Sequence, residues 1–123
     1  MADIDSDLVS ELLTLSEDEL LLRIGTSLSP RTMFPLTPEK VMQIAKDWLN
    51  ERIERLRTTT CNSQETKALA KPDISSHEMV VVIAGTLDVG VHLLGGVPAV
   101  TVAALIVRIG IHQFCAPIWK SDS

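Results

Sequence analysis

The sequence contains no tyrosine, and aromatic residues make up only 3% of its 123 residues. A core built from this chain must therefore be aliphatic, assembled from Leu, Ile, Val and Ala. Apolar residues still amount to 46% of the chain, which argues against wholesale disorder. This length fits a single domain with one modest hydrophobic core.

Basic residues are scarce at the start of the chain. Residues 1–30 carry a net charge of −6, residues 31–76 a net charge of +2, and residues 77–123 a net charge of −1. Phosphate binding requires a basic face, so we expect no nucleic-acid partner. In residues 31–76 the acids are interleaved with the bases, a pattern typical of a solvated helix face.

Cysteine is equally scarce, with only Cys61 and Cys115 in the chain. The acidic start has no apolar stretch behind a basic end, so we expect no secretory signal peptide. Disulfides require an oxidising compartment, for which the sequence offers no sign. We therefore predict free thiols and a cytoplasmic location.

Motifs that bind nucleotides or metals are also missing. Nothing matches G-x-x-x-x-G-K-[ST] or G-x-G-x-x-G. Asp88 and His92 lie four residues apart on one expected helix, but no third ligand of suitable spacing accompanies them. Cys115 follows His112 by three residues, and a cysteine nucleophile would also need an acid nearby. We predict no catalytic residue, no metal and no cofactor, and hence no enzyme.

The first half of the chain carries clear helix signals. Leucines at helical spacing predict a short helix from about Asp7 to Leu15. Ser16 to Glu19 has the S-x-x-E form of a capping box, which predicts a second helix from about Glu17 to Ser27. A Thr-Pro-Glu start at Thr37 predicts a third, amphipathic helix to about Arg57.

A strongly apolar segment follows the amphipathic helices. Asn62 is expected to cap a short helix through Ala70, and Ser75 to Glu78 form a second capping box. We predict two antiparallel apolar helices, about 76–94 and 98–114, that turn at Gly95-Gly96. The β-branched runs at 79–83 and 101–111 also fit strands. The capping box and the long uninterrupted run after Pro98 favour helices.

The predicted fold is therefore all-α, with five or six helices in a single domain over residues 1–123. Residues 1–58 form an amphipathic helical layer, residues 59–75 a connection with a short helix, and residues 76–116 an apolar helical hairpin. Asp88 and Arg108 are the only formal charges between residues 79 and 113. They fall at similar levels of the two arms, so we expect them to form a buried polar pair or to point into a shared polar cavity.

The environment of the hairpin has two interpretations. Each arm is about 17 residues, or roughly 25 Å, at the lower limit for spanning a bilayer. A charge at the centre of each arm would cost about 2.5–3.5 kcal/mol on insertion. We therefore favour a hairpin buried in a protein core or a homo-oligomer. Membrane association is the alternative, supported by few polar residues and by Trp119-Lys120 as an interfacial anchor.

So small a chain cannot easily cover two apolar helices, and large exposed apolar patches mark partner sites. We therefore predict a non-enzymatic interaction or assembly module that binds a protein partner or a second copy. The alternative function is a small membrane-acting effector that inserts a two-helix hairpin. The residues expected to make the contacts are Trp48, Leu94, Val97, Leu105 and Trp119.

Overall fold

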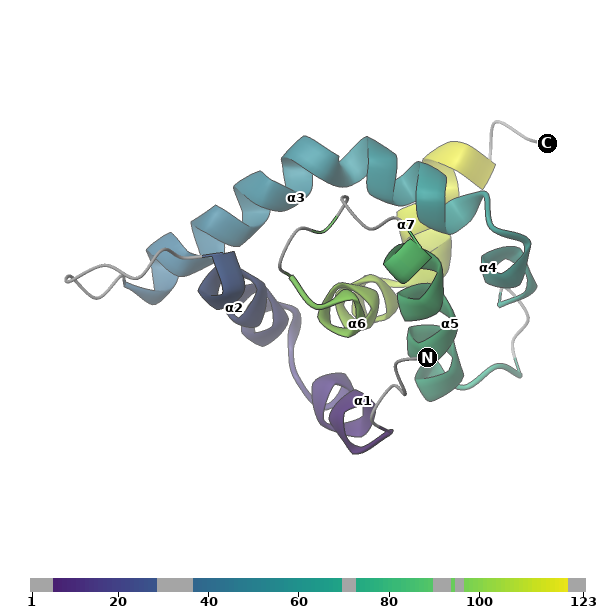
Figure 1. Cartoon of the computed structure of the whole chain (residues 1–123), viewed down its shortest axis with the longest axis horizontal. Coiled ribbons are helices and arrows are strands. Elements are labelled where there is room, and N and C mark those ends of the chain that lie inside the picture. Colours follow the sequence, from purple (N-terminus) through teal and green to yellow (C-terminus); the bar gives the residue numbers. More distant parts are fainter. Residues whose placement is uncertain (1–5, 29–36, 70–72, 90–93, 95–96, 120–123) are drawn as a thin grey trace.

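The computed structural model describes residues 6–28, 37–69, 73–89, 94 and 97–119. These residues form helices and no strand, which confirms the all-α prediction and excludes the strand alternative at 79–83 and 101–111. The described part contains seven helices rather than five or six (Figure 1). They are α1 (Ser6–Leu13), α2 (Glu17–Leu28), α3 (Pro38–Cys61), α4 (Gln64–Ala68), α5 (Ser76–Val89), α6 (Ala99–Ile109) and α7 (Ile111–Trp119).

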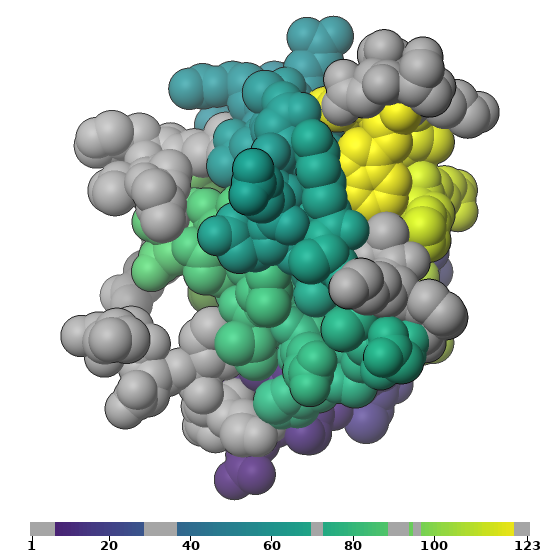
Figure 2. Space-filling view, turned by 90° about the vertical axis from the view of Figure 1, so that its right-hand side faces the viewer, coloured from purple at the N-terminus to yellow at the C-terminus, as the bar shows by residue number. Residues whose placement is uncertain are grey.

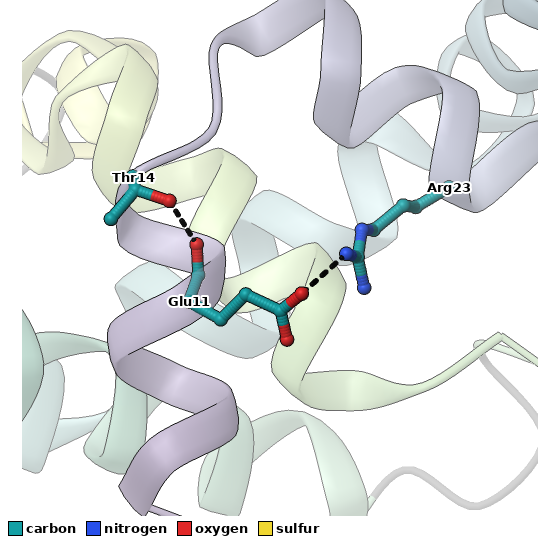
Figure 3. A network of polar contacts seen from close by, with 3 residues as sticks. All are labelled: Glu11, Thr14 and Arg23. Atoms are coloured by element: carbon teal, nitrogen blue, oxygen red, sulfur yellow. Dashed lines mark hydrogen bonds and ion pairs between the residues drawn. The ribbon is translucent and has the colours of Figure 1, made fainter.

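The start of α2 forms the capping box that the sequence predicts. The Glu19 backbone N–H donates to Ser16 Oγ at 3.1 Å, and the Ser16 N–H donates to the Glu19 carboxylate at 3.3 Å. An exposed ion pair of 3.0 Å between Arg23 and Glu11 joins α2 to α1 (Figure 3). An ion pair this exposed contributes little stability, at most about 1 kcal/mol. The capping box therefore contributes more to fixing the start of α2 than this ion pair does.

The long helix α3 begins where the sequence predicts and ends later. The Thr37 hydroxyl accepts the Lys40 backbone N–H at 3.3 Å, and Pro38 occupies the first turn. The helix continues past the predicted end at Arg57 to Cys61. Asn62 closes α3 by donating its N–H to the Thr58 carbonyl, so the prediction that Asn62 caps the next helix is wrong. Ser63 is the N-cap residue of α4.

Helices α2 and α3 cross closely at Gly25. A Cβ atom built on Gly25 would overlap the Val41 carbonyl oxygen and lie 2.6 Å from Val41 Cγ1. Only glycine lets the two backbones approach this far, because any side chain at residue 25 would push α3 away. The crossing sets the position of α3 over the rest of the molecule.

Helices α5 and α6 lie in the segments predicted as the two arms of an apolar hairpin, and they pack against each other. The Ser75 hydroxyl accepts the Glu78 N–H at 3.1 Å, as the capping box predicts. The proposed turn at Gly95-Gly96 and the residue His92 lie outside the described residues. The described part therefore shows paired helices without testing how the chain turns between them.

The second arm is shorter than predicted, because the chain bends at Gly110. Gly110 has a φ of +110°, a region that side chains disfavour, and the axes of α6 and α7 differ by 86°. The predicted continuous helix over 98–114 is therefore wrong. The bend turns α7 back against the C-terminal half of α3, where the two helices are in contact.

Helix α6 lies at the centre of the fold. Figure 1 shows it end-on, with α1, α2, α3, α5 and α7 around it. All six residues from Thr101 to Ile106 are buried, so the core is aliphatic as predicted. Val81, on α5, is an exposed large hydrophobic side chain. The chain thus shelters more of its apolar segment than the sequence suggests.

Candidate functional site

The outer face of α5 carries Val81, an exposed large hydrophobic side chain. Four exposed residues at spacings of three, four and three lie along it: Glu78, Val81, Gly85 and Asp88. This spacing places them on one side of a helix. We call this set the α5 stripe. It has an apolar centre, Val81 and Gly85, between two acidic ends.

A groove runs beside the α5 stripe, between α5 and the junction of α3 with α4. Its volume is about 560 Å³. Figure 2 shows this face, with the teal residues of α3 and α4 bordering the green residues of α5. A Cβ built on Gly85 would meet no atom within 4 Å, so the groove is open there. The lining residues are Thr59, Ser63, Glu65, Val81, Val82, Gly85 and Thr86.

The groove is acidic. Glu65 lines it from α4, and the Ser63 hydroxyl donates to the Glu65 carboxylate at 2.7 Å. This hydrogen bond, together with one from the backbone, lowers the pKa of Glu65 below its ordinary value. None of the lining residues is basic. With Glu78 and Asp88 at the ends of the α5 stripe, the groove and the stripe carry acidic side chains.

Helix α7 is attached to the end of α3 by a disulfide. Cys61 and Cys115 are both fully buried and bonded, with their Cα atoms 5.5 Å apart. The predicted free thiols are therefore wrong, and Cys115 is not available as a nucleophile. The sequence pattern missed the pair because a straight helix over 98–114 carries Cys115 away from α3, whereas the bend at Gly110 returns it.

Two hydrogen bonds accompany the disulfide. Trp119 Nε1 donates to the Cys61 carbonyl at 2.9 Å, and Arg57 Nε donates to the Phe114 carbonyl at 3.0 Å. The Arg57 guanidinium also lies 5.5 Å from the centre of the Phe114 ring. Together with the covalent bond, these contacts hold α7 in one position on α3.

The residues expected to contact a partner lie inside the molecule. Trp48, Leu94, Val97 and Leu105 are buried, each less than a tenth exposed, and Trp119 is half-buried. Their side chains fill the core of a single chain. A partner would reach them only after the helices rearranged.

Asp88 and Arg108 are both exposed, so neither charge is buried as the sequence suggests. The two ion pairs among the described residues join Arg23 to Glu11 and Arg52 to Glu51. Each of the two predicted partners lies near the end of its helix, where water solvates the charge. Neither charge then needs a buried counter-ion.

No protein-family model, curated protein or solved structure matches this chain. His112 is exposed and makes an edge contact with Trp119, with ring centres 5.6 Å apart. Among the described residues, no group of three or more His, Cys, Asp or Glu side chains is placed to hold a metal ion.

The sequence did not single out Val81, Gly85 or Glu65 as site residues. A signal for the first two was present, because Glu78, Val81, Gly85 and Asp88 share one helix face and the two charges mark that face as solvated. Nothing comparable pointed to Glu65. Its position in the groove follows from the packing of α4 beside α5, which no local pattern encodes.

Proposed function

We propose that the chain is a non-enzymatic interaction module that binds a basic amphipathic helix of a partner protein along the α5 stripe. One observation carries the proposal. Helix α5 is apolar on nearly all sides, and such a helix is normally buried, yet Val81 is 36% exposed and Gly85 faces open space. An apolar helix face left uncovered is typical of a partner site.

The shape of the surface suits a helix. Gly85 leaves a hollow one turn along from the Val81 side chain, so an incoming helix can approach the α5 backbone closely. The groove beside the stripe has room for the partner's side chains. Burying Val81 fully would add about 1 kcal/mol, because roughly a third of the side chain is still in water.

The charges favour a basic partner. Glu78, Asp88 and Glu65 surround the apolar centre, and a partner helix with Lys or Arg at both ends of an apolar face would meet an acid at each end. Exposed charges of this kind mainly speed association and select among partners. They are screened by salt over about 8 Å at physiological ionic strength.

The same charges disfavour a second copy of the chain as the occupant. Antiparallel pairing of two α5 helices around the Val81–Gly85 centre would bring Glu78 of one copy opposite Asp88 of the other. Parallel pairing would bring each acid opposite itself. Like charges directly opposed are destabilising, so we place a basic partner ahead of the homo-oligomer.

A pair of synthetic helical peptides tests the proposal. Both carry the same Leu/Ala face, one flanked by lysines and the other by glutamates. We expect the full chain to bind the lysine peptide in a fluorescence-anisotropy titration, more weakly as salt increases, and not to bind the glutamate peptide. Equal binding of the two peptides, or of neither, would contradict the proposal.

Substitutions in the groove provide the matched variants. A Cβ at Gly85 meets no atom within 4 Å, so we expect Gly85→Leu to fill the hollow, keep the fold and weaken binding by about tenfold or more. Glu54→Leu, at an exposed position of α3 away from the groove, is the control and should bind normally. Light scattering could instead give twice the chain mass of 13.5 kDa for the wild type and the single mass for Gly85→Leu. That result would mean that a second copy, and not a partner protein, occupies the α5 stripe.

One observation favours the alternative of a membrane-acting effector. Within the described residues no single helix is long and apolar enough to cross a bilayer, but α6 and α7 together meet that requirement by length and composition. Insertion would require α6 to leave the core and α7 to leave α3, which the disulfide opposes. Co-sedimentation with anionic vesicles only after reduction would support this alternative over the peptide-binding module.

The location that we propose follows from the disulfide. Disulfides persist in oxidising compartments and are rare in a reducing cytosol. The Cys61–Cys115 bond therefore favours an oxidising compartment over the cytoplasm expected from the sequence. Thiol alkylation at the moment of cell lysis tests this. Unmodified cysteines would support the oxidising compartment, whereas two alkylated cysteines would support the cytoplasm.

A further inference from the structure

A second cavity lies on the other side of α6, between α3, α6 and α7. Its volume is about 140 Å³. The buried side chains of Leu56, Val102 and Ile106 line its inner part. Arg57, Gln113 and Ile109, which are half-buried or exposed, lie toward solvent. The cavity is therefore an apolar pocket with one cation and one amide at its opening.

Arg57 is held in place, but its positive charge is not paired with a carboxylate of the described residues. Its Nε donates to the Phe114 carbonyl, and its guanidinium lies against the Phe114 ring, which also lines the pocket. Neither contact neutralises the cation. No carboxylate of the described residues forms an ion pair with Arg57. A fixed guanidinium presents paired N–H donors in a geometry that matches a carboxylate.

The wall formed by α7 is rigid. The disulfide at Cys115 and the hydrogen bond from Trp119 both attach α7 to Cys61 at the end of α3, and the hydrogen bond from Arg57 to the Phe114 carbonyl attaches it one turn earlier. The pocket is thus formed before any ligand arrives, which lowers the entropic cost of binding. Its volume is close to that of an engineered apolar cavity, about 150 Å³, that binds benzene in another protein.

We propose that this pocket binds a small carboxylate with an apolar body of about the size of a benzene ring. The apolar body fills the space beside Val102 and Ile106, and the carboxylate accepts hydrogen bonds from Arg57. Gln113 at the opening can donate one more. The site is separate from the α5 groove, so it stands whether or not the proposed partner binding is correct.

Benzoate is the probe for this site. In a titration of the full oxidised chain followed by ¹H–¹⁵N NMR, we expect shifts at Leu56, Ile106 and Phe114 and a dissociation constant on the order of 1 mM. Benzyl alcohol has the same ring without the charge, and acetate has the charge without the ring. Both should bind at least about tenfold more weakly, because each lacks one of the two interactions.

Three variants complete the test. Arg57→Gln should weaken benzoate binding about tenfold and leave benzyl alcohol binding unchanged. Arg55→Gln removes a nearby exposed cation of α3 that does not line the pocket, and it should bind benzoate normally. Ile109→Trp fills the pocket from a half-buried position and should abolish binding, with far-UV circular dichroism confirming the fold.

The following results would overturn the proposal. They are the absence of benzoate binding, equal affinity for benzoate and benzyl alcohol, or normal benzoate binding by Arg57→Gln. Shifts confined to residues outside the pocket would also overturn it. A loss of binding in Arg57→Gln that extends equally to benzyl alcohol would assign Arg57 a structural role at α7 rather than a role in recognising the ligand.

Discussion

Reduction of the Cys61–Cys115 bond should remove a large part of the stability of this protein. The two cysteines are separated by 54 residues in the sequence. In the chain-entropy model, releasing a loop of this length from the unfolded state lowers the free energy of unfolding by about 4 kcal/mol. A domain of this size has only about 5–15 kcal/mol in total. The reduced chain is therefore expected to be marginally stable.

Urea denaturation followed by tryptophan fluorescence measures this loss, with and without a phosphine reductant. Trp119 contacts the Cys61 backbone, so one of the two tryptophans lies beside the bond. A double variant, Cys61→Ala with Cys115→Ala, is the matched control. Its stability should be low and should not respond to the reductant, because it has no bond to lose.

Two results would contradict this reasoning. The first is an unchanged midpoint of the wild-type chain after complete reduction. The second is the detection of two free thiols when the unreduced protein is denatured and titrated with a thiol reagent. The second result would mean that the bond does not form, and the proposed oxidising compartment would lose its support.

Three further predictions concern stability and ionisation. Gly25→Ala should lower the free energy of unfolding by about 1–3 kcal/mol in urea denaturation, because the new methyl group overlaps Val41 at the α2–α3 crossing. Thr66→Val should raise the midpoint of thermal unfolding, with a gain of about 1 kcal/mol, because the buried Thr66 hydroxyl has no hydrogen-bond partner. Ser63→Ala should raise the pKa of Glu65 toward its ordinary value in an NMR titration. Since that pKa is lowered in the folded chain, the associated stabilisation is present at neutral pH and is lost as pH falls through the folded value.

Local signals predicted the individual helices well. Ser16, Thr37 and Ser75 each cap a helix through the hydrogen bond that the sequence implies, because capping depends on residues within one turn. Gly110 shows where local reasoning fails. In the sequence it is one of several glycines in an apolar run, and no neighbouring residue indicates that its φ is positive. Whether a glycine bends the chain is decided by the packing of the helices on either side.

The burial of the predicted contact residues has a related cause. Leu105 and Trp48 were expected at an interface because the apolar segment looked too large for the chain to cover. The bend at Gly110 lets α6 sit at the centre of the fold, where neighbouring helices bury the residues from Thr101 to Ile106. The side that stays open belongs to α5, at Val81 and Gly85. Which of two apolar helices becomes the central one depends on tertiary arrangement, and the spacing of Glu78 and Asp88 marks only that one face of α5 is solvated.

The cross-link between α3 and α7 also makes a closed covalent ring of residues 61–115, which holds all of α4, α5 and α6. One protease cut anywhere within that ring opens it without separating the pieces. A nicked molecule would therefore migrate as one species on a non-reducing gel and as two after a thiol is added. Limited proteolysis must for this reason be analysed in both states, since damage to the central helices stays hidden while the bridge is intact.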